Sequence, residues 1–106
     1  MIKLIVMYGQ PDDPAAFDAH YLSVHTGLVA QLPGLRRFEV AKCASTDGTA
    51  APYYLQAELW FDDAASMDAS FATPEGQATR QDVANFATGD VTRMVGEVVS
   101  ELVAGS

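Results

Sequence analysis

The order of segments along this 106-residue chain predicts an α+β fold with the ferredoxin-like order β-α-β-β-α-β. Four short stretches carry the β-branched, aromatic or alternating apolar residues that are typical of strands, and helix caps stand between them. Such an order places helices against one face of a four-stranded antiparallel sheet. No repeat or linker divides the sequence, so we expect a single domain over residues 1–106.

The first half of the chain supplies two strands and one long helix. Ile2 to Tyr8 is a near-continuous apolar run, as expected of a strand buried on both faces. Asp13 is a suitable helix cap and Pro14 a suitable first helical residue, so a helix is predicted from there to about Leu32, before a Pro-Gly pair. The segment from Leu35 to Lys42 is the second predicted strand.

The second half repeats the pattern after a turn-like segment over residues 43–52. Tyr53 to Phe61 alternates apolar and polar residues and is the third predicted strand. One helix is predicted from Asp62-Asp63 to about residue 72 and another from Thr73-Pro74 to about residue 86. Val91 to Val103 is the last predicted strand, in which Gly96 is a candidate interruption.

Composition excludes several classes of partner. With 14 acidic and 6 basic residues the formal charge is -8, which disfavours nucleic acids and anionic membranes. Cys43 is the single cysteine, so no internal disulfide is possible and a reducing compartment is indicated. No segment approaches the ~20 apolar residues of a membrane-spanning helix. We therefore expect a cytoplasmic protein.

The strands carry large apolar residues on both faces, although helices cover only one. Leu4 and Val6 alternate with Ile5 and Met7, and Trp60 lies opposite its apolar neighbours on the third strand. An uncovered apolar sheet face usually marks an interface. We expect a homodimer formed through the open sheet face, the alternative being a monomer with a partly apolar, hydrated face.

His25 is the candidate catalytic residue. With Phe17 at 0° on a helical wheel, His25 falls at about 80°, inside the apolar arc that faces the sheet. His20 lies outside this arc. An imidazole in this position can serve as general base or general acid. The alternative interpretation is a neutral core histidine with both nitrogens satisfied.

The sequence offers no metal or cofactor motif. His20 and His25 are five residues apart, about 140° around an ideal helix, whereas a helical two-histidine metal site uses a spacing of four. Phosphate-binding glycine loops and the G-x-S-x-G nucleophile motif are absent. We therefore expect neither a metal nor an organic cofactor.

Aromatic residues are the candidates for binding a small apolar ligand near His25. Such side chains could form pocket walls, and tyrosine hydroxyls could orient a ligand oxygen. The alternative is that they simply form the core. The candidate binding residues are Tyr8, Phe17, Tyr21, Trp60 and Phe86.

The predicted first helix also resembles a known family. Its residues Phe17-Asp18-x-x-Tyr21-Leu22-x-x-His25-x-x-Leu28-Val29 resemble a helix motif of the EthD family, named after ethyl tert-butyl ether degradation. The first strand, the segment Asp47-Gly48-x-x-Ala51-Pro52-Tyr53 and the pair Asn85-Phe86 are similar to further stretches of that family. Two positions differ: Gly27 replaces the usual proline and Leu22 replaces the usual second aromatic residue.

The resemblance implies a dimeric α/β barrel, in which two sheets pack together and each protomer has a cavity between its sheet and helices. It favours a functional role for His25. It does not fix the reaction, because related families include cofactor-free monooxygenases, isomerases and cyclases. The leading hypothesis is a protein of a catabolic or tailoring pathway that binds a small, oxygen-bearing aromatic or dicarbonyl-like molecule and uses His25 as acid or base, as an oxidoreductase, lyase or isomerase. The alternative is a noncatalytic binding or accessory protein.

Overall fold

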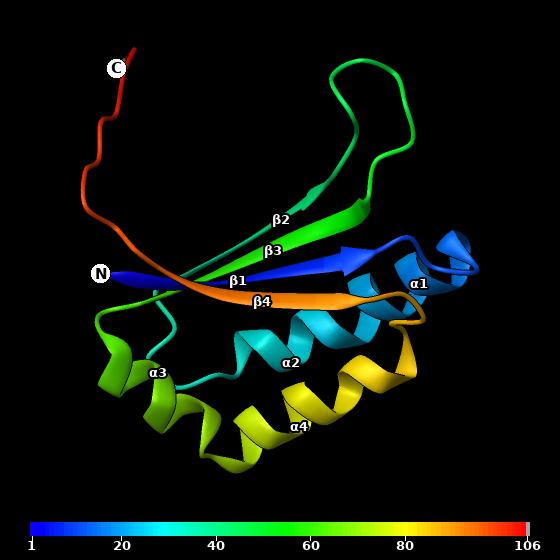
Figure 1. Cartoon of the computed structure of the whole chain (residues 1–106). Coiled ribbons are helices and arrows are strands. Elements are labelled where there is room, and N and C mark those ends of the chain that lie inside the picture. The colour runs from blue at the N-terminus through cyan, green and yellow to red at the C-terminus, as the bar shows by residue number, and fades with distance from the viewer. Residues whose placement is uncertain (106) are drawn as a thin grey trace.

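The computed structural model describes residues 1–105 and contains one four-stranded antiparallel sheet (Figure 1). The strands are β1 (Ile2–Gly9), β2 (Arg37–Lys42), β3 (Tyr53–Phe61) and β4 (Val91–Glu97). Their order across the sheet is β2-β3-β1-β4, and every neighbouring pair is antiparallel. The predicted antiparallel sheet is therefore confirmed.

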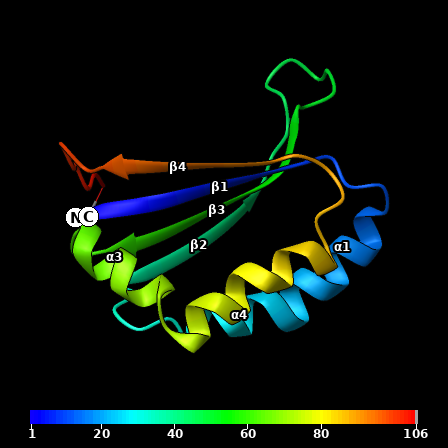
Figure 2. The same ribbon diagram turned by 60° about the horizontal axis from the view of Figure 1, so that its bottom comes forward.

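The helices all lie against one face of the sheet (Figure 2). Three N-caps form as predicted: the side chains of Asp13, Asp63 and Thr73 each accept a hydrogen bond from a backbone N–H three residues later. Among residues 1–105, no helix is both long enough and apolar enough to cross a membrane. The helical elements are α1 (Pro14–His20), the π turn η1 (Tyr21–His25), α2 (Thr26–Ala30), α3 (Ala64–Phe71), α4 (Pro74–Asp82) and the 3₁₀ turn η2 (Val83–Asn85).

The first helix is not the regular α-helix that its sequence predicts. Between α1 and α2 the chain makes one wider turn, in which the N–H of Thr26 bonds to the carbonyl of Tyr21, five residues earlier. Such π turns insert one extra residue into a helix and are frequent at functional sites. The helix then continues through Gly27, so the glycine that replaces the family's proline does not end it.

The core lies between the sheet and the helices. Alternate residues of β1 and β3, including Val6, Tyr8 and Leu59, point toward the helices and are buried. The alternation fails at Tyr54, because the pairing of β1 with β3 skips this residue. Its ring consequently packs on Phe17, 5.2 Å between centroids, rather than on the Trp60 face that simple alternation predicts.

The opposite face of the sheet is more polar than expected. Lys3 Nζ lies 2.6 Å from Glu58 Oε2, and Lys3 and Arg37 both stack over the ring of Trp60. Ile5 and Met7 of β1 lie between these polar groups and β4. The open face is therefore amphipathic, with apolar residues next to paired charges.

The last strand ends at Glu97 and not at Val103. The regular pairing of β4 with β1 ends where Glu97 lies opposite Ile2, and the N–H of Val98 makes one further bond to the carbonyl of Met1. The chain beyond Glu97 leaves the sheet on the side away from the helices, as does the loop between β2 and β3 (Figure 1). Val99 and Leu102 in this segment are both 89% exposed.

Candidate functional site

Two histidines of the first helix share one carboxylate of α4. His20 Nε2 lies 2.8 Å from Asp82 Oδ1, and His25 Nδ1 lies 2.9 Å from Asp82 Oδ2. An ideal α-helix would direct residues five apart to different faces, as the sequence analysis assumed. The hydrogen bond of a π turn joins residues five apart and so aligns the two histidines. The expected divergence of His20 and His25 is therefore wrong.

The protonation states of this trio follow from burial and hydrogen bonding. Burial raises the pKa of Asp82, but hydrogen bonds from Asn85, His20 and His25 outweigh it and hold the pKa below its ordinary value. Burial lowers the pKa of His25 by more than the bond to Asp82 raises it. At neutral pH Asp82 is therefore ionised and His25 is neutral.

The carboxylate also fixes which nitrogen of His25 carries the proton. An ionised carboxylate only accepts hydrogen bonds, so Nδ1 of His25 must be the donor and Nε2 is left unprotonated. An imidazole held in this way by a carboxylate is prepared to act as a general base through Nε2. Within the described part of the chain, no three His, Cys, Asp or Glu side chains are grouped as a metal site.

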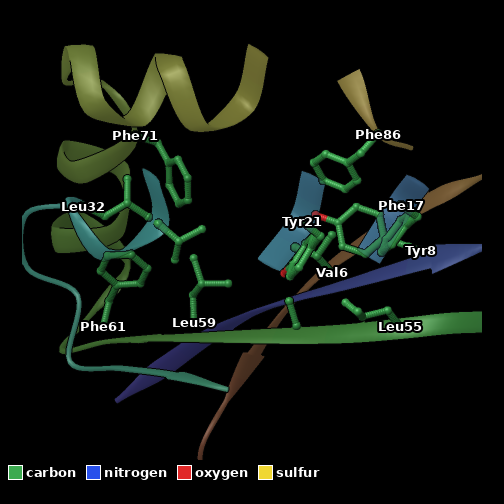
Figure 3. Close-up of a cluster of buried hydrophobic side chains, with 12 residues drawn as sticks. Val6, Tyr8, Phe17, Tyr21, Leu32, Leu55, Leu59, Phe61, Phe71 and Phe86 are labelled. Atoms are coloured by element: carbon green, nitrogen blue, oxygen red, sulfur yellow. The ribbon is translucent and has the colours of Figure 1, made fainter. Parts of the chain in front are cut away.

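His25 borders a small cavity between the sheet and the helices. Its volume is about 40 Å³, enough for a few water molecules. Figure 3 shows the buried side chains in two groups, one with Tyr8, Phe17, Tyr21 and Phe86, the other with Leu59, Phe61 and Phe71. The cavity is lined by members of both groups. The full lining is Leu4, Val6, Tyr8, Tyr21, His25, Val29, Phe38, Leu59, Phe71, Thr79, Arg80, Val83 and Arg93.

The cavity adjoins a wider cleft on the protein surface. The cleft has a volume of about 310 Å³ and shares four lining residues with the cavity, namely Leu4, Phe71, Arg80 and Arg93. This volume is at the lower end of the range for small-molecule pockets, about 300–1,000 Å³. The cleft therefore lies next to the cavity that His25 borders.

Two tyrosines, Tyr8 and Tyr21, line the cavity together with His25. Tyr21 is 1% exposed, and its hydroxyl finds no hydrogen-bond partner within residues 1–105. A buried hydroxyl without a partner carries a free-energy cost that a ligand oxygen would relieve. Burial raises the pKa of Tyr8 to about 12 and raises the pKa of Tyr21 as well. Both hydroxyls therefore keep their protons at neutral pH and can donate to a ligand.

The other predicted binding residues lie farther from the cavity. Phe86 packs edge-on against His25, 4.7 Å between centroids, and Phe17 stacks on Tyr21 at 5.6 Å. Both rings therefore pack against residues that line the cavity but do not line it themselves. Trp60 lies on the open face of the sheet, over Lys3 and Arg37, and so is not brought to His25.

Asp82, which orients His25, is not among the site residues predicted from the sequence. A signal for it existed in α4, whose buried residues Gly76, Thr79 and Asp82 recur every three positions. A carboxylate in the buried row of an otherwise polar helix needs donors nearby. The two histidines of the first helix are the donors that it finds.

Comparison with known proteins places the chain in a family. Residues 10–90 match the EthD domain. The chain belongs to the EthD family. It is 47% identical over 94 residues to an uncharacterized 11.0 kDa protein in the thcB-thcC intergenic region of Rhodococcus erythropolis, a match covering 89% of this chain and 91% of that protein. The EthD family that the sequence resemblance indicates is thereby confirmed.

Solved structures of EthD proteins share the fold. An EthD family protein from Bacillus halodurans is 39% identical, with a TM-score of 0.88 and coverage of 93% of this chain and 99% of that one. An EthD-like protein from Ralstonia eutropha is 25% identical, with a TM-score of 0.76 and coverage of 95% and 94%.

More distant structures show likeness of fold alone. A dimeric ferredoxin-like protein of unknown function from Jannaschia sp. is 23% identical, with a TM-score of 0.67 and coverage of 92% and 98%. SnoaB, a cofactor-independent oxygenase from Streptomyces nogalater, is 15% identical, with a TM-score of 0.69 and coverage of 95% of both chains. The predicted ferredoxin-like α+β fold class is confirmed.

Proposed function

We propose that this EthD protein binds a small, largely apolar molecule bearing a carbonyl or phenol oxygen, and that His25 moves a proton to or from it without a cofactor. The observation that carries this proposal is the neutral ring of His25, which Asp82 orients, among the residues that line a cavity together with Tyr8 and Tyr21. The Tyr21 hydroxyl has no hydrogen-bond partner within residues 1–105. A general base and two tyrosine hydroxyl donors at one cavity suit a substrate that is an enolisable ketone.

The proposed step is proton abstraction from a carbon next to a carbonyl. The C–H bond breaks and its electron pair forms the C=C bond of the enolate, while the π pair of the carbonyl moves to oxygen and the proton goes to Nε2 of His25. Asp82 stabilises the imidazolium that forms, since it lies 2.9 Å from Nδ1. The hydroxyls of Tyr8 and Tyr21 donate to the enolate oxygen. Return of the proton to carbon restores His25, so the step needs no oxidant or reductant.

We also infer that the protein is a homodimer joined through the open sheet face. Several fold neighbours are described as dimeric ferredoxin-like proteins. The face carries Ile5, Met7 and Trp60, and paired charges such as Lys3 with Glu58 leave little net charge to repel a second copy. The exposed apolar segment after Glu97 and the loop between β2 and β3 project on this side, where a second sheet would pack against them (Figure 1).

A proton-exchange assay tests the proposed function. Phenylacetone, an aromatic ketone, is incubated with the protein in heavy water, and loss of its methylene signal is followed by proton NMR. We expect exchange above the buffer rate, falling by about 10²–10⁴-fold in His25→Gln. Arg36→Gln is the control, because this side chain pairs with Asp62 and does not line the cavity.

Binding is measured in parallel by saturation-transfer NMR, which separates catalysis from simple ligand binding. If His25→Gln keeps binding and loses exchange, the acid–base role holds. Binding without exchange in the unmodified protein would contradict catalysis and favour a carrier. Exchange that is equally fast in His25→Gln would contradict the role of His25.

A further inference from the structure

The basic residues of this acidic protein divide into two groups. Four of the six lie within ion-pair distance of a carboxylate: the pairs are Lys3 with Glu58, Arg36 with Asp62, Arg37 with Glu39, and Lys42 with Asp18. Arg80 and Arg93 form no such pair within residues 1–105.

Both unpaired arginines border the site described above. Each lines the small cavity at His25 and also the wider cleft, so they stand where the two meet. Arg80 comes from α4, where its guanidinium stacks over Phe71 at 5.0 Å. Arg93 comes from β4, where it pairs with Val6 of β1 and so shares the helix-covered face of the sheet.

The surroundings of the two guanidinium groups are mostly apolar. Leu4, Met67 and Phe71 complete the cleft with Asp68, and no ion pair within residues 1–105 joins Asp68 to either arginine. The charge of Arg93 also affects Tyr8. Burial raises the pKa of Tyr8 to about 12, and the nearby Arg93 charge partly opposes this rise. The entrance therefore carries a local positive charge on a protein whose net charge is -8.

We propose that Arg80 and Arg93 bind the carboxylate of an anionic substrate whose apolar, oxygen-bearing body reaches into the cavity toward His25. Arginine side chains recognise carboxylates by paired N–H donors, and the stacking of Arg80 on Phe71 limits the freedom it would lose on binding. A carboxylate at the entrance would leave the opposite end of the molecule facing His25 and the tyrosines. This inference rests on the proposed function and narrows its substrate class to organic acids.

A matched pair of probes tests the role of charge. Salicylate and salicylamide share a ring and a phenol, but only salicylate is an anion. We expect salicylate to bind about tenfold more tightly at low ionic strength, the effect of two partly exposed ion pairs, and we expect added salt to reduce this preference. Dissociation constants are measured by titration calorimetry or ligand-observed NMR.

Arginine variants then assign the preference to these two side chains. The double variant Arg80→Gln with Arg93→Gln should bind both probes equally, while Arg80→Lys should keep part of the preference. Arg36→Gln is the matched control and should behave as the unmodified protein, because its partner Asp62 lies outside the cleft. Thermal melting of each variant verifies that it remains folded.

The outcomes separate this inference from the proposed function. Equal binding of the two probes to the unmodified protein would overturn the carboxylate site, and so would a preference that survives in the double glutamine variant. Neither result affects binding of salicylamide or proton exchange of phenylacetone, on which the proposed function depends. Failure of both probes to bind would count against the inference and the proposed pocket together.

Discussion

Replacing Asp82 by asparagine keeps the size of the side chain and removes the charge that three donors share. His20 Nε2, His25 Nδ1 and Asn85 Nδ2 lie 2.8, 2.9 and 3.0 Å from its two oxygens. An amide offers one accepting oxygen and one donating nitrogen. Its NH₂ group would meet the N–H of His25, so His25 must move its proton to Nε2 to accept from the amide.

The magnitude follows from the change in bond type. A hydrogen bond to a charged group contributes about 1.5–3 kcal/mol, and one between neutral groups about 0.5–1.5 kcal/mol. Weakening three bonds by about 1 kcal/mol each lowers the free energy of unfolding by about 3 kcal/mol. The urea midpoint should then fall by about 1–3 M, given the slopes usual for small domains.

The assay is urea unfolding followed by tryptophan fluorescence at a fixed protein concentration, since dimer stability depends on concentration. Asp12→Asn is the matched control: the same chemical change at an exposed loop carboxylate should alter stability by no more than about 0.5 kcal/mol. If Asp82→Asn unfolds at the same urea concentration as the unmodified protein, Asp82 does not hold the two histidines as described.

Three further predictions concern packing, pH and assembly. Gly76→Ala should lower the free energy of unfolding by about 3 kcal/mol, because the new Cβ would overlap the backbone at the end of α3. Gly27→Ala is the control: its Cβ meets open space on an exposed helix, and it should raise the free energy of unfolding by about 1 kcal/mol. Because burial holds the pKa of His25 below its ordinary 6.5, stability present above that pH should be lost as the pH falls through the pKa of the folded protein; a His25→Gln variant should lack this part of the pH dependence, and an identical pH profile would contradict it. Met94→Glu on the open sheet face should shift the protein toward monomers in light scattering, whereas Leu22→Glu on the helical layer should not; an unmodified protein that is already monomeric would contradict the homodimer.

Much of the fold was predictable because local rules act on each element separately. Alternation located β3 to the residue, and the caps at Asp13, Asp63 and Thr73 marked three helix starts. The end of β4 was not predictable from its own residues, because it depends on how far the pairing with β1 extends. The inward turn of Tyr54 likewise depends on a pairing irregularity between two strands.

The candidate site was predictable only in part, for a similar reason. Helical periodicity placed His25 and Tyr21 on the buried face, and both border the cavity. Periodicity assumes a regular helix, so it could not anticipate the π turn that turns His20 and His25 toward Asp82. Trp60 shows a similar limitation for strands. Alternation predicts which residues share a face with Trp60, but it does not predict which face of the sheet borders the pocket.

The protonation state of the His25 ring tests the central claim most directly. Nitrogen NMR of the protein with isotope-labelled histidine reports which ring nitrogen carries the proton and at what pH the ring becomes charged. The account predicts a neutral ring at neutral pH, with the proton on Nδ1, Nε2 free, and a pKa below 6.5. A ring that is protonated on Nε2, or fully charged at neutral pH, would contradict the assignment of His25 as a base at the cavity.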